Sequence, residues 1–592
     1  MKGILITQCV QNDFVRPLRA DESLPNLVHV GRFEADRLAG PNGVLIPFLR
    51  AAHAAKDLAI IHVVDQHDPV RHKAHFDLFR PHCVVGSEGA KLIASIDALA
   101  NDDPDTRLVP AGDLNDFEDS ALMRTLTDLG ATPDTPIGVI GVWTDAKVAF
   151  LLYDLRTRFK AKKLATCSGL TASRSMDAHF RALESLKIVL DVELHHSPAS
   201  FLAWLDPQAP PPALAPAAQC EFTKAIGTPS WWTPAHVAER DSLIGAIAGS
   251  KVQLQPLGGG FSGAQVFIAR TTGPARVVKV GARDEIARER FGNERVARVL
   301  GDVVPRLLQY REGPRLAAME MELAQSSDPR ASTPATFQWL AQSDPSDEMA
   351  AVLDTALELA MDRALGRLYR VAEKDNADLL TTFGFTDNYG KPQFVDSVCR
   401  HAETVAKATD GTAAAAGVVA FYRQWLPGRT MMREVFTAPV HADFNLQNLL
   451  LSCRPGEAAP AHVWLIDFAR LTRLPNLTDF AKVENDLSYI VLPASENAAR
   501  MQEARLASAS LEIDLAPFAV TPEERRYARW MATLRRVAAR MDPRGAPAMA
   551  DYRVALLRYA AHTIGFDEPT MAQRGLALLA CARLAAMISS NS

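Results

Sequence analysis

Short apolar runs alternate with amphipathic stretches along the first 200 residues. The runs, each of which predicts a buried strand, are Ile4–Thr7, Leu58–Val64, Ile137–Gly141 and Ile188–Asp191. Helix-like stretches such as Val44–Lys56 and Lys147–Arg158 lie between them. This alternation predicts repeated strand–helix–strand units, a parallel sheet and helices on both of its faces. We therefore expect an α/β, doubly wound domain over residues 1–205.

A proline-rich segment ends this pattern. Residues 207–218 read PQAPPPALAPAA, and five of these twelve residues are proline. Such a segment cannot form a helix interior or a central strand, and it is typical of an extended spacer. We place a linker and lead-in at residues 206–240, which includes Trp231 and Trp232. A helix is predicted over Pro234–Ala248.

The remainder of the chain changes from strand-like to helical patterning. Residues 251–325 look strand-rich, with one helix predicted around Glu285–Leu300, and helical periodicity dominates from about residue 348. The exception is a β-like stretch, Val435–Phe468. Thr521 followed by proline and two glutamates predicts a helix start. We predict a two-lobed α+β domain at 241–592, with a small lobe at about 241–325 and a helical large lobe at about 326–592.

Composition and charge exclude several classes of protein. The chain has 592 residues, more than the roughly 250–300 that one core supports, so at least two domains are expected. The net charge of −5 gives no basic field for nucleic acid. Seven scattered cysteines without a CxxC pair indicate reduced thiols. Without a signal segment, or an apolar run near the ~18 residues that cross a bilayer, we expect a cytoplasmic protein that contacts no membrane.

Two features of the small lobe suit nucleotide phosphates. Gly258, Gly260 and Gly263 match GxGxxG between strand-like runs, and glycines let backbone N–H groups approach phosphate oxygens. A glycine-rich hairpin produces the same pattern, but the strand that follows disfavours a dinucleotide-binding fold. Lys279 lies on an apolar strand, Val-Val-Lys-Val. We predict Glu294 on the next helix as its ion-pair partner, with Glu289 as the alternative.

The large lobe supplies the other groups that phosphoryl transfer requires. The segment His441-Ala-Asp-Phe-Asn-Leu-Gln-Asn448 places Asp443 where it can accept or orient a substrate proton. Asn448, five residues later, can reach a Mg²⁺ ion from the same loop. The apolar strand Val-Trp-Leu-Ile ends at Asp467, whose carboxylate we assign to the metal that bridges the β- and γ-phosphates. ATP and Mg²⁺ are therefore the predicted cofactors.

Residues of about 250–590 resemble the protein-kinase-like superfamily, nearer to aminoglycoside and choline phosphotransferases than to protein kinases. The block after His441 and the sequence Asp467-Phe-Ala carry this resemblance. The stretch from Trp464 to Glu484 is similar to kinase-like domains associated with ternary conflict and signalling systems of bacteria. The resemblance implies an ATP-dependent phosphotransferase with an adenine-binding hinge at Met319–Ala324. The acceptor is an unidentified small molecule or protein.

Three blocks of the first domain, beginning at Cys9, His82 and Gly141, resemble the isochorismatase-like cysteine hydrolases. That family uses an Asp/Lys/Cys triad in which a thiolate attacks a carbonyl carbon. By position, Cys9 replaces the aspartate, the lysine falls near Ala111, and Lys147 replaces the nucleophilic cysteine. Thiolate chemistry cannot proceed without a thiolate. We therefore expect a degenerate hydrolase fold that senses a ligand or binds a protein partner.

Two other interpretations stay open. In the first, the C-terminal domain is a nucleotide-binding pseudokinase scaffold, although its predicted catalytic and binding residues are all present. In the second, the N-terminal domain is an active hydrolase whose relocated chemistry uses Cys9 and Lys147 together. We expect no metal site at the histidines, because their spacing lacks the context of one; they are His67, His72, His75, His195 and His196.

Overall fold

The computed structural model describes residues 3–41, 43–102, 106–118, 120–257, 263–385 and 394–590. By contacts, the chain forms two compact units: Met1–Phe291 with Leu307–Glu322, and Gly292–Arg306 with Leu323–Ser592. This division keeps the N-terminal domain and the small lobe in one unit. The boundary between Glu322 and Leu323 lies inside Met319–Ala324, the stretch predicted as the adenine-binding hinge. The sequence-based boundary at the proline-rich segment stays a prediction, and each unit is described below by itself.

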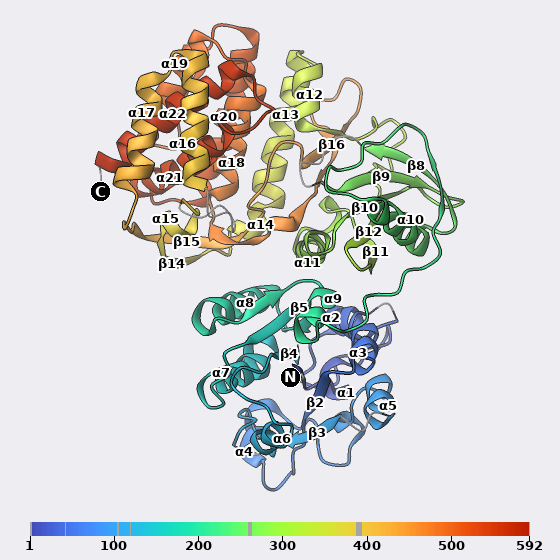
Figure 1. The fold of residues 1–592 in the computed structure, drawn as a ribbon. Helices are drawn as coiled ribbons and strands as arrows, with labels where there is room; N and C mark the ends of the chain where they lie inside the picture. Colours follow the sequence, from blue (N-terminus) through green and yellow to red (C-terminus); the bar gives the residue numbers. More distant parts are fainter. Residues whose placement is uncertain are drawn as a thin grey trace. The chain divides into compact units, whose positions relative to one another are not determined.

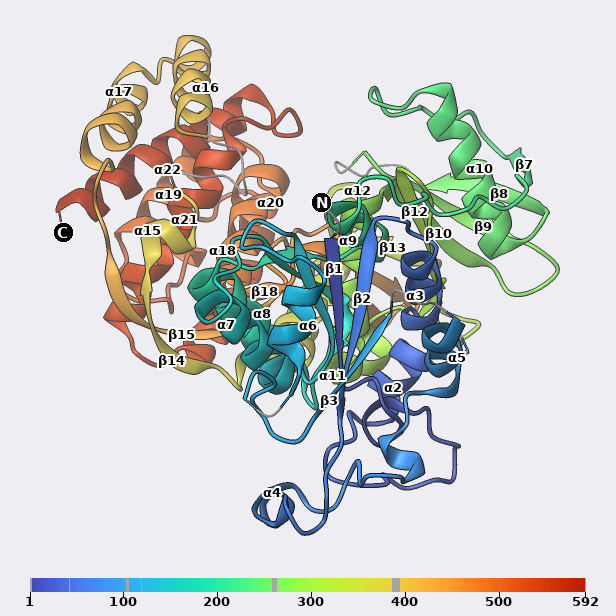
Figure 2. The ribbon, with the colours of Figure 1, turned by 60° about the horizontal axis from the view of Figure 1, so that its bottom comes forward.

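The first unit begins with a parallel six-stranded sheet of order β3-β2-β1-β4-β5-β6. Figure 2 shows β1 and β2 side by side. The strand order reverses direction between β1 and β4, which confirms the predicted doubly wound topology. The strands are β1 (Gly3–Gln8), β2 (Leu58–Asp65), β3 (Arg107–Ala111), β4 (Ile137–Val142), β5 (Leu164–Ala172) and β6 (Glu193–His195).

Helices cover both faces of this sheet (Figure 1), and each face has its own apolar core. One core contains residues of α2 (Arg32–Ala39), α3 (Leu45–His53), α5 (Ala94–Asp102) and α9 (Pro198–Leu205). The other contains residues of α6 (Leu122–Asp128), α7 (Ala149–Thr157) and α8 (Met176–Leu190). Two shorter helices follow β1 and β2 directly: α1 (Asn12–Val15) and α4 (Lys73–Phe79).

One predicted strand was wrong. Ile188 lies in the last turn of α8, and Asp191 caps that helix in the left-handed conformation. Ile188 and Val189 are each 72% exposed, so this apolar run does not mark a buried element. The strand β6 begins two residues after the cap.

The proline-rich segment contains no helix or strand, as predicted, until β7 (Gln219–Phe222). β7 pairs in parallel with β8 (Lys251–Leu257), so part of the predicted lead-in belongs to the small-lobe sheet, whose order is β11-β12-β10-β9-β8-β7. Helix α10 (Pro234–Ala248) has the predicted bounds and packs its apolar residues on this sheet. The other elements are β9 (Gln265–Arg270), β10 (Arg276–Ala282), α11 (Arg283–Leu300), β11 (Leu307–Glu312) and β12 (Leu316–Glu322).

The second unit is mainly helical and has two small sheets, of order β13-β16-β17 and β14-β15-β18. As predicted, α20 starts at Thr521 with a capping box. The strands are β13 (Ala335–Thr336), β14 (Glu373–Asp378), β15 (Met432–Val440), β16 (Leu449–Cys453), β17 (Pro460–Leu465) and β18 (Thr472–Pro475). The helices are α12 (Phe337–Ser343), α13 (Asp347–Glu358), α14 (Gly366–Tyr369), α15 (Leu379–Thr382), α16 (Phe394–Thr409), α17 (Thr412–Ala420), α18 (Thr478–Asp486), α19 (Glu496–Ala507), α20 (Pro522–Met541), α21 (Ala546–Thr563) and α22 (Met571–Ser590).

A buried ionic network holds α18 among its neighbouring helices. The carboxylate of Glu484 accepts hydrogen bonds from Arg535 of α20 at 2.9 and 2.6 Å and from Tyr552 of α21 at 2.8 Å. Arg505 of α19 lies 3.2 Å from the same group. Loss of one partner from a buried charge pair is strongly destabilising. The network therefore fixes which helices surround α18, the helix that reaches the site described next.

Helix α22 is long and apolar enough to cross a membrane by length and composition, but 56% of its most apolar window is buried inside the protein. It lies against α16, α17 and α21. Among the described residues it is the one helix that meets these criteria. A buried core helix has the same composition.

Candidate functional site

The segment that begins at His441 is held in place by a carboxylate of α18. Asp479 accepts hydrogen bonds from the backbone N–H groups of His441 and Ala442, both at 2.8 Å. Tyr369 donates its hydroxyl to the same carboxylate at 2.7 Å. Ala442 has a φ of +64°, a conformation that non-glycine residues adopt only when surrounding contacts hold them there. Asp479 therefore sets the backbone direction of the residue before Asp443.

Three of the predicted residues come together around this loop. The side-chain nitrogen of Asn448 donates to the carbonyl of Asp443 at 3.0 Å, which leaves the amide oxygen of Asn448 for another partner. The N–H of Ile466 donates to the carbonyl of Asn448 at 3.1 Å, so the residue before Asp467 is joined to the loop. Asp467 has a left-handed backbone, with φ of 65° and ψ of 59°. The loop thus gathers two carboxylates and one amide oxygen, which are hard ligands suited to Mg²⁺.

Asp443 is exposed, and its carboxyl group has an elevated pKa. The protein around the carboxyl group desolvates it, and this is the largest contribution. The positive charge of Lys482 and the ring of His441 lower the pKa, whereas the carboxylates of Asp467 and Asp486 raise it. A carboxylate whose proton affinity is increased in this way is suited to accept a proton.

Lys482 is a residue that the sequence motifs do not reveal. Its ammonium lies 3.0 Å from the carboxylate of Asp486, and that carboxylate also accepts a hydrogen bond from the N–H of Leu446 at 3.1 Å. Burial lowers the pKa of Lys482, but the negative charges of Asp486 and Asp443 outweigh it and the pKa is raised. Asp479, Lys482 and Asp486 follow each other at three- and four-residue spacing, which places them on one face of α18. That spacing is the signal by which they could have been found.

The small-lobe residues lie in the first unit. Gly258 and Gly260 are outside the described residues, and Gly263 has a φ of +69°. The ammonium of Lys279 lies 2.6 Å from a carboxylate oxygen of Glu289, the partner that we gave as the alternative to Glu294. Glu289 follows Ile286 by three residues, and Ile286 packs beneath the small-lobe sheet, so both face the strand of Lys279.

The second half of α11, which belongs to the second unit, touches the strand end that carries Asp467. A Cβ atom at Gly292 would lie 2.0 Å from the carbonyl oxygen of Phe468. Only glycine permits this close approach. The ring of Phe468 in turn lies 4.6 Å from that of His441, measured between centroids. The helix, the Asp467 turn and the predicted catalytic loop are therefore in direct contact.

In the N-terminal domain, Lys147 follows β4 at the position of the hydrolase nucleophile. Its ammonium lies 3.0 Å from Asp65 and 2.7 Å from Asp116, and it donates to the carbonyl of Asp113 at 2.6 Å. Burial lowers the pKa of Lys147, but the two carboxylates outweigh it and raise that pKa. Burial raises the pKa of Asp116 to about 6 despite Lys147. Asp116 lies five residues beyond Ala111, so a carboxylate stands near the expected place of the lysine.

Cys9 is fully buried and lacks the properties of a nucleophile. Burial, together with the negative charge of Asp65, raises the pKa of the Cys9 thiol well above its usual value, and Lys147 only partly opposes this. Burial likewise raises the pKa of Cys83. Raised thiol pKa values in apolar surroundings are typical of inert cysteines. The site contains lysine, carboxylate and thiol groups, but not in an arrangement that produces a thiolate.

Three histidines of the N-terminal domain lie close together, although their spacing in the sequence gave no reason to expect a metal site at them. The ring nitrogens of His67, His75 and His82 that could bind a metal lie within 4.8 Å of one another. His67 and His82 direct their Nδ1 atoms to the carbonyls of Gly112 (3.1 Å) and Arg80 (2.8 Å), and Nε2 of His82 lies 3.4 Å from Nε2 of His75. Nε2 of His67 is buried without a hydrogen-bond partner.

The histidine cluster is suited to hold a divalent cation. Burial lowers the pKa of His75 to about 4, and burial also lowers the pKa of His82, so both rings are neutral near pH 7. Neutral imidazoles oriented by backbone carbonyls are the usual form of metal-ligating histidine. The carboxylate of Asp65 lies 3.6 Å from Nε2 of His67. Sequence spacing missed this cluster because His82 comes from a separate loop.

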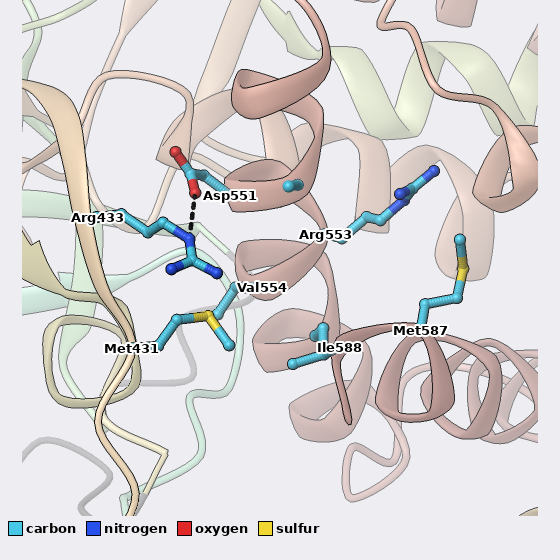
Figure 3. Close-up of a pocket in the computed structure, with 8 residues that line it drawn as sticks. Met431, Arg433, Asp551, Arg553, Val554, Met587 and Ile588 are labelled. Atoms are coloured by element: carbon cyan, nitrogen blue, oxygen red, sulfur yellow. Dashed lines mark ion pairs between the residues drawn. The ribbon is translucent and has the colours of Figure 1, made fainter. Parts of the chain in front are cut away.

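Two cavities lie within the described residues. Figure 3 shows one of about 40 Å³ beside α21 and α22, where Arg433 lies 3.9 Å from Asp551. A space of this size holds little more than water. A wider depression of about 360 Å³ in the N-terminal domain is lined by Leu24, Pro25, Asn26, Leu27, His29, Arg80, Pro81 and Arg174.

Comparison with known proteins finds resemblances for two parts of the chain. Residues 386–565 match the family model described as ternary complex associated domain 9, which confirms the predicted resemblance of the large lobe. No curated protein matches the chain.

Solved structures match the N-terminal third of the chain. A nicotinamidase from Bacillus subtilis is 22% identical, with a TM-score of 0.28, and the match covers 33% of this chain and 99% of that one. An isochorismatase-like hydrolase from Alkaliphilus metalliredigens is 22% identical (TM-score 0.27; 33% and 95% covered). A pyrazinamidase of Pyrococcus horikoshii, solved in complex with zinc, is 17% identical (TM-score 0.25; 33% and 98% covered). The fold class rests on the strand order and helix layers described above.

Proposed function

We propose that the C-terminal domain is a phosphotransferase that uses ATP and Mg²⁺. The observation that carries this proposal is the loop clamped by Asp479, which presents Asp443 beside Asn448 and Asp467. The ion pair of Lys279 with Glu289 supports it from the small lobe. By its similarity to ternary complex associated domains, the protein would act in a bacterial signalling or conflict system.

Each residue has a distinct role in this proposal. Asp443 accepts or orients the proton of the acceptor hydroxyl, and its elevated pKa favours that task. Lys279, oriented by Glu289, neutralises phosphate charge. Asn448 and Asp467 would hold Mg²⁺, which stabilises negative charge on the phosphates when bound. The acceptor is an unidentified small molecule or protein.

The first test of the proposal is nucleotide binding followed by turnover. Millimolar Mg·ATP should raise the melting temperature of the purified chain, because a ligand that binds the native state stabilises it. Lys279→Met should abolish most of this shift. ATP turnover should then be measured against panels of metabolites and peptides. Binding without turnover would favour the pseudokinase scaffold, and a chain without any Mg·ATP-dependent shift would contradict the proposal.

For the N-terminal domain, we propose a sensing or docking role rather than hydrolysis. The buried thiol of Cys9 and the paired ammonium of Lys147 leave no nucleophile at the hydrolase position. The purified chain should therefore hydrolyse neither nicotinamide nor isochorismate-like esters. Hydrolysis that is lost in Cys9→Ala but kept in Asp443→Ala would instead show that the N-terminal domain is an active hydrolase with relocated catalytic residues.

A second candidate function is metal binding at His67, His75 and His82, favoured by the buried, unpartnered Nε2 of His67. These residues would hold zinc or a similar cation, as the pyrazinamidase from Pyrococcus horikoshii was solved with zinc. Zinc titration followed by calorimetry should give one site per chain. His82→Ala should lose it, whereas the control His462→Ala, in the other unit, should keep it. Equal zinc binding by both variants would contradict this assignment.

A further inference from the structure

Three consecutive residues of α11 have three different partners within the first unit. Glu289 pairs with Lys279 at 2.6 Å. The guanidinium of Arg290 lies over the ring of Tyr310, 4.5 Å from its centroid. Phe291 contacts the N-terminal domain. Since the helix backbone moves as one body over a single turn, the contacts of Arg290 and Phe291 bear directly on the position of Glu289.

The contact of Phe291 is with aromatic rings of the N-terminal domain. Its ring centroid lies 5.7 Å from His179 and 5.3 Å from Phe180, both in α8, and 5.1 Å from His196 after β6. Phe291 is buried. Aromatic pairs at these separations attract each other beyond the effect of their buried area. The N-terminal domain thus packs directly against α11.

A polar connection runs beside the aromatic one. Tyr310, beneath Arg290, donates its hydroxyl to Glu312 at 2.6 Å. The other carboxylate oxygen of Glu312 accepts the N–H of Ala199 at 2.9 Å, in the first turn of α9. A carboxylate at a helix N-terminus is favoured by the unpaired N–H groups there. Arg283, the first residue of α11, also donates to the hydroxyl of Ser200 at 3.1 Å.

We propose that the N-terminal domain acts as a positioning element for the phosphotransfer site, through Phe291 and Glu312. The aromatic contact of Phe291, and the hydrogen bond of Glu312 to the first turn of α9, hold α11 in the position at which Glu289 pairs with Lys279. The state of the N-terminal domain is therefore transmitted to the nucleotide site. A degenerate hydrolase fold kept on the same chain gains a function in this way. The inference rests on the proposed nucleotide-binding function of the small lobe.

Two measurements on the full-length chain test this coupling. The first is the affinity for Mg·ATP by calorimetry in Phe291→Ala and Glu312→Gln, where we expect binding about 5–10-fold weaker, at the lower end of couplings between sites. Phe291→Tyr, which keeps the ring, should retain affinity. Phe159→Ala removes a partly buried ring that follows α7 in the N-terminal domain and should leave affinity unchanged.

The second measurement is amide hydrogen exchange over residues 283–291, which reports the hold on α11 without nucleotide. Exchange there should accelerate in Phe291→Ala and Glu312→Gln but not in Phe159→Ala, since exchange follows local opening. Unchanged exchange and unchanged Mg·ATP affinity in Glu312→Gln and Phe291→Ala would overturn the inference. A wild-type chain that binds no Mg·ATP, but whose α11 exchange responds to these variants, would overturn the phosphotransferase function instead.

Discussion

The two charged clusters of this protein differ in how far their charges are buried and paired within the protein. In the N-terminal domain, Lys147 lies between Asp65 and Asp116, and all three side chains are buried. In the large lobe, Asp443 is exposed. The side-chain nitrogen of Asn448 makes a hydrogen bond within the loop, and this bond does not use the amide oxygen of the same side chain. In the first cluster the charged groups pair with one another, whereas in the second some polar groups stay available for a ligand. Availability, more than residue type, separates a structural cluster from a functional one.

Both clusters nonetheless contain uncommon backbone conformations. Cys9 has a φ of 51°, and Ala442 and Asp467 have φ of 64° and 65°. Such positions cluster at functional sites because surrounding contacts hold them there. Other residues with positive φ, such as Asp191 at the end of α8, lie outside both clusters. Backbone geometry alone therefore does not mark a site, and the chemistry of the residues has to be considered with it.

The largest effect that sharpens the comparison is expected at Asp443. Asp443→Ala should lower kcat by about 10²–10⁴-fold, the usual contribution of a general base, and leave Mg·ATP affinity nearly unchanged. Asp467→Asn should weaken Mg·ATP binding as well, because it removes a charged ligand. Steady-state kinetics and one calorimetric titration per variant measure both. Loss of nucleotide binding in Asp443→Ala, with binding and rate kept in Asp467→Asn, would reverse the two roles.

A stability measurement tests the inert character of the N-terminal cluster. Lys147→Met leaves Asp65 and Asp116 buried without their cation, so unfolding in urea should become easier by about 3–5 kcal/mol. Lys162→Met removes an exposed pair with Asp134 and should change stability by less than about 1 kcal/mol. A Lys147→Met chain as stable as the wild type would show that the cluster does not serve as a structural ion pair.

The sequence predicted the local parts of the molecule better than the long-range ones. Hydrophobic alternation predicted the doubly wound sheet, and short windows of sequence also singled out Asp443, Asn448 and Asp467, whose roles stay predictions. Asp479, which clamps the loop, comes from a helix almost forty residues later, and only the tertiary fold brings it there.

The errors have the same physical origin. Ile188 belongs to an apolar run that remains exposed, so composition alone suggested a strand where a helix ends. Glu294 and Glu289 both lie on α11, and the pairing of Lys279 with Glu289 depends on how this helix packs on its sheet, which the sequence does not show. The histidine cluster needs His82 from a separate loop, which no spacing rule anticipates.

The pH dependence of the reaction tests whether Asp443 acts as a base whose pKa is set by Lys482. Lys482 lowers the pKa of Asp443, so Lys482→Met should raise that pKa further and move the acid limb of kcat to higher pH. Protonated Asp443 cannot accept a proton, so activity is lost as the pH falls through its pKa. The loss of kcat at pH 8 should stay below about tenfold, or 1.36 kcal/mol. Lys482→Arg should restore the profile, and an unmoved limb in Lys482→Met would contradict this coupling.

The smallest expected effect concerns the reactivity of Cys9. It distinguishes an inactive N-terminal domain from an active hydrolase that uses Cys9 and Lys147. Cys9 is buried, whereas Cys220 and Cys453 are half-buried. Burial raises the pKa of Cys220 to about 11, so at pH 8 only about one thousandth of it is thiolate. It should nevertheless react with iodoacetamide faster than Cys9, which needs the domain to open before the reagent can reach it. Mass spectrometry of native and urea-unfolded protein gives the labelling rate of each cysteine.

The wild-type labelling pattern can be compared directly with that of Lys147→Met. The positive charge of Lys147 lowers the pKa of the Cys9 thiol, so its loss raises that pKa and decreases the thiolate fraction. The same substitution destabilises the domain, which increases opening. If opening limits the reaction, Cys9 should label faster in Lys147→Met. If Cys9 instead labels faster than Cys220 in the wild type, and more slowly in Lys147→Met, then Lys147 activates a reactive thiol and the N-terminal cluster is a working site.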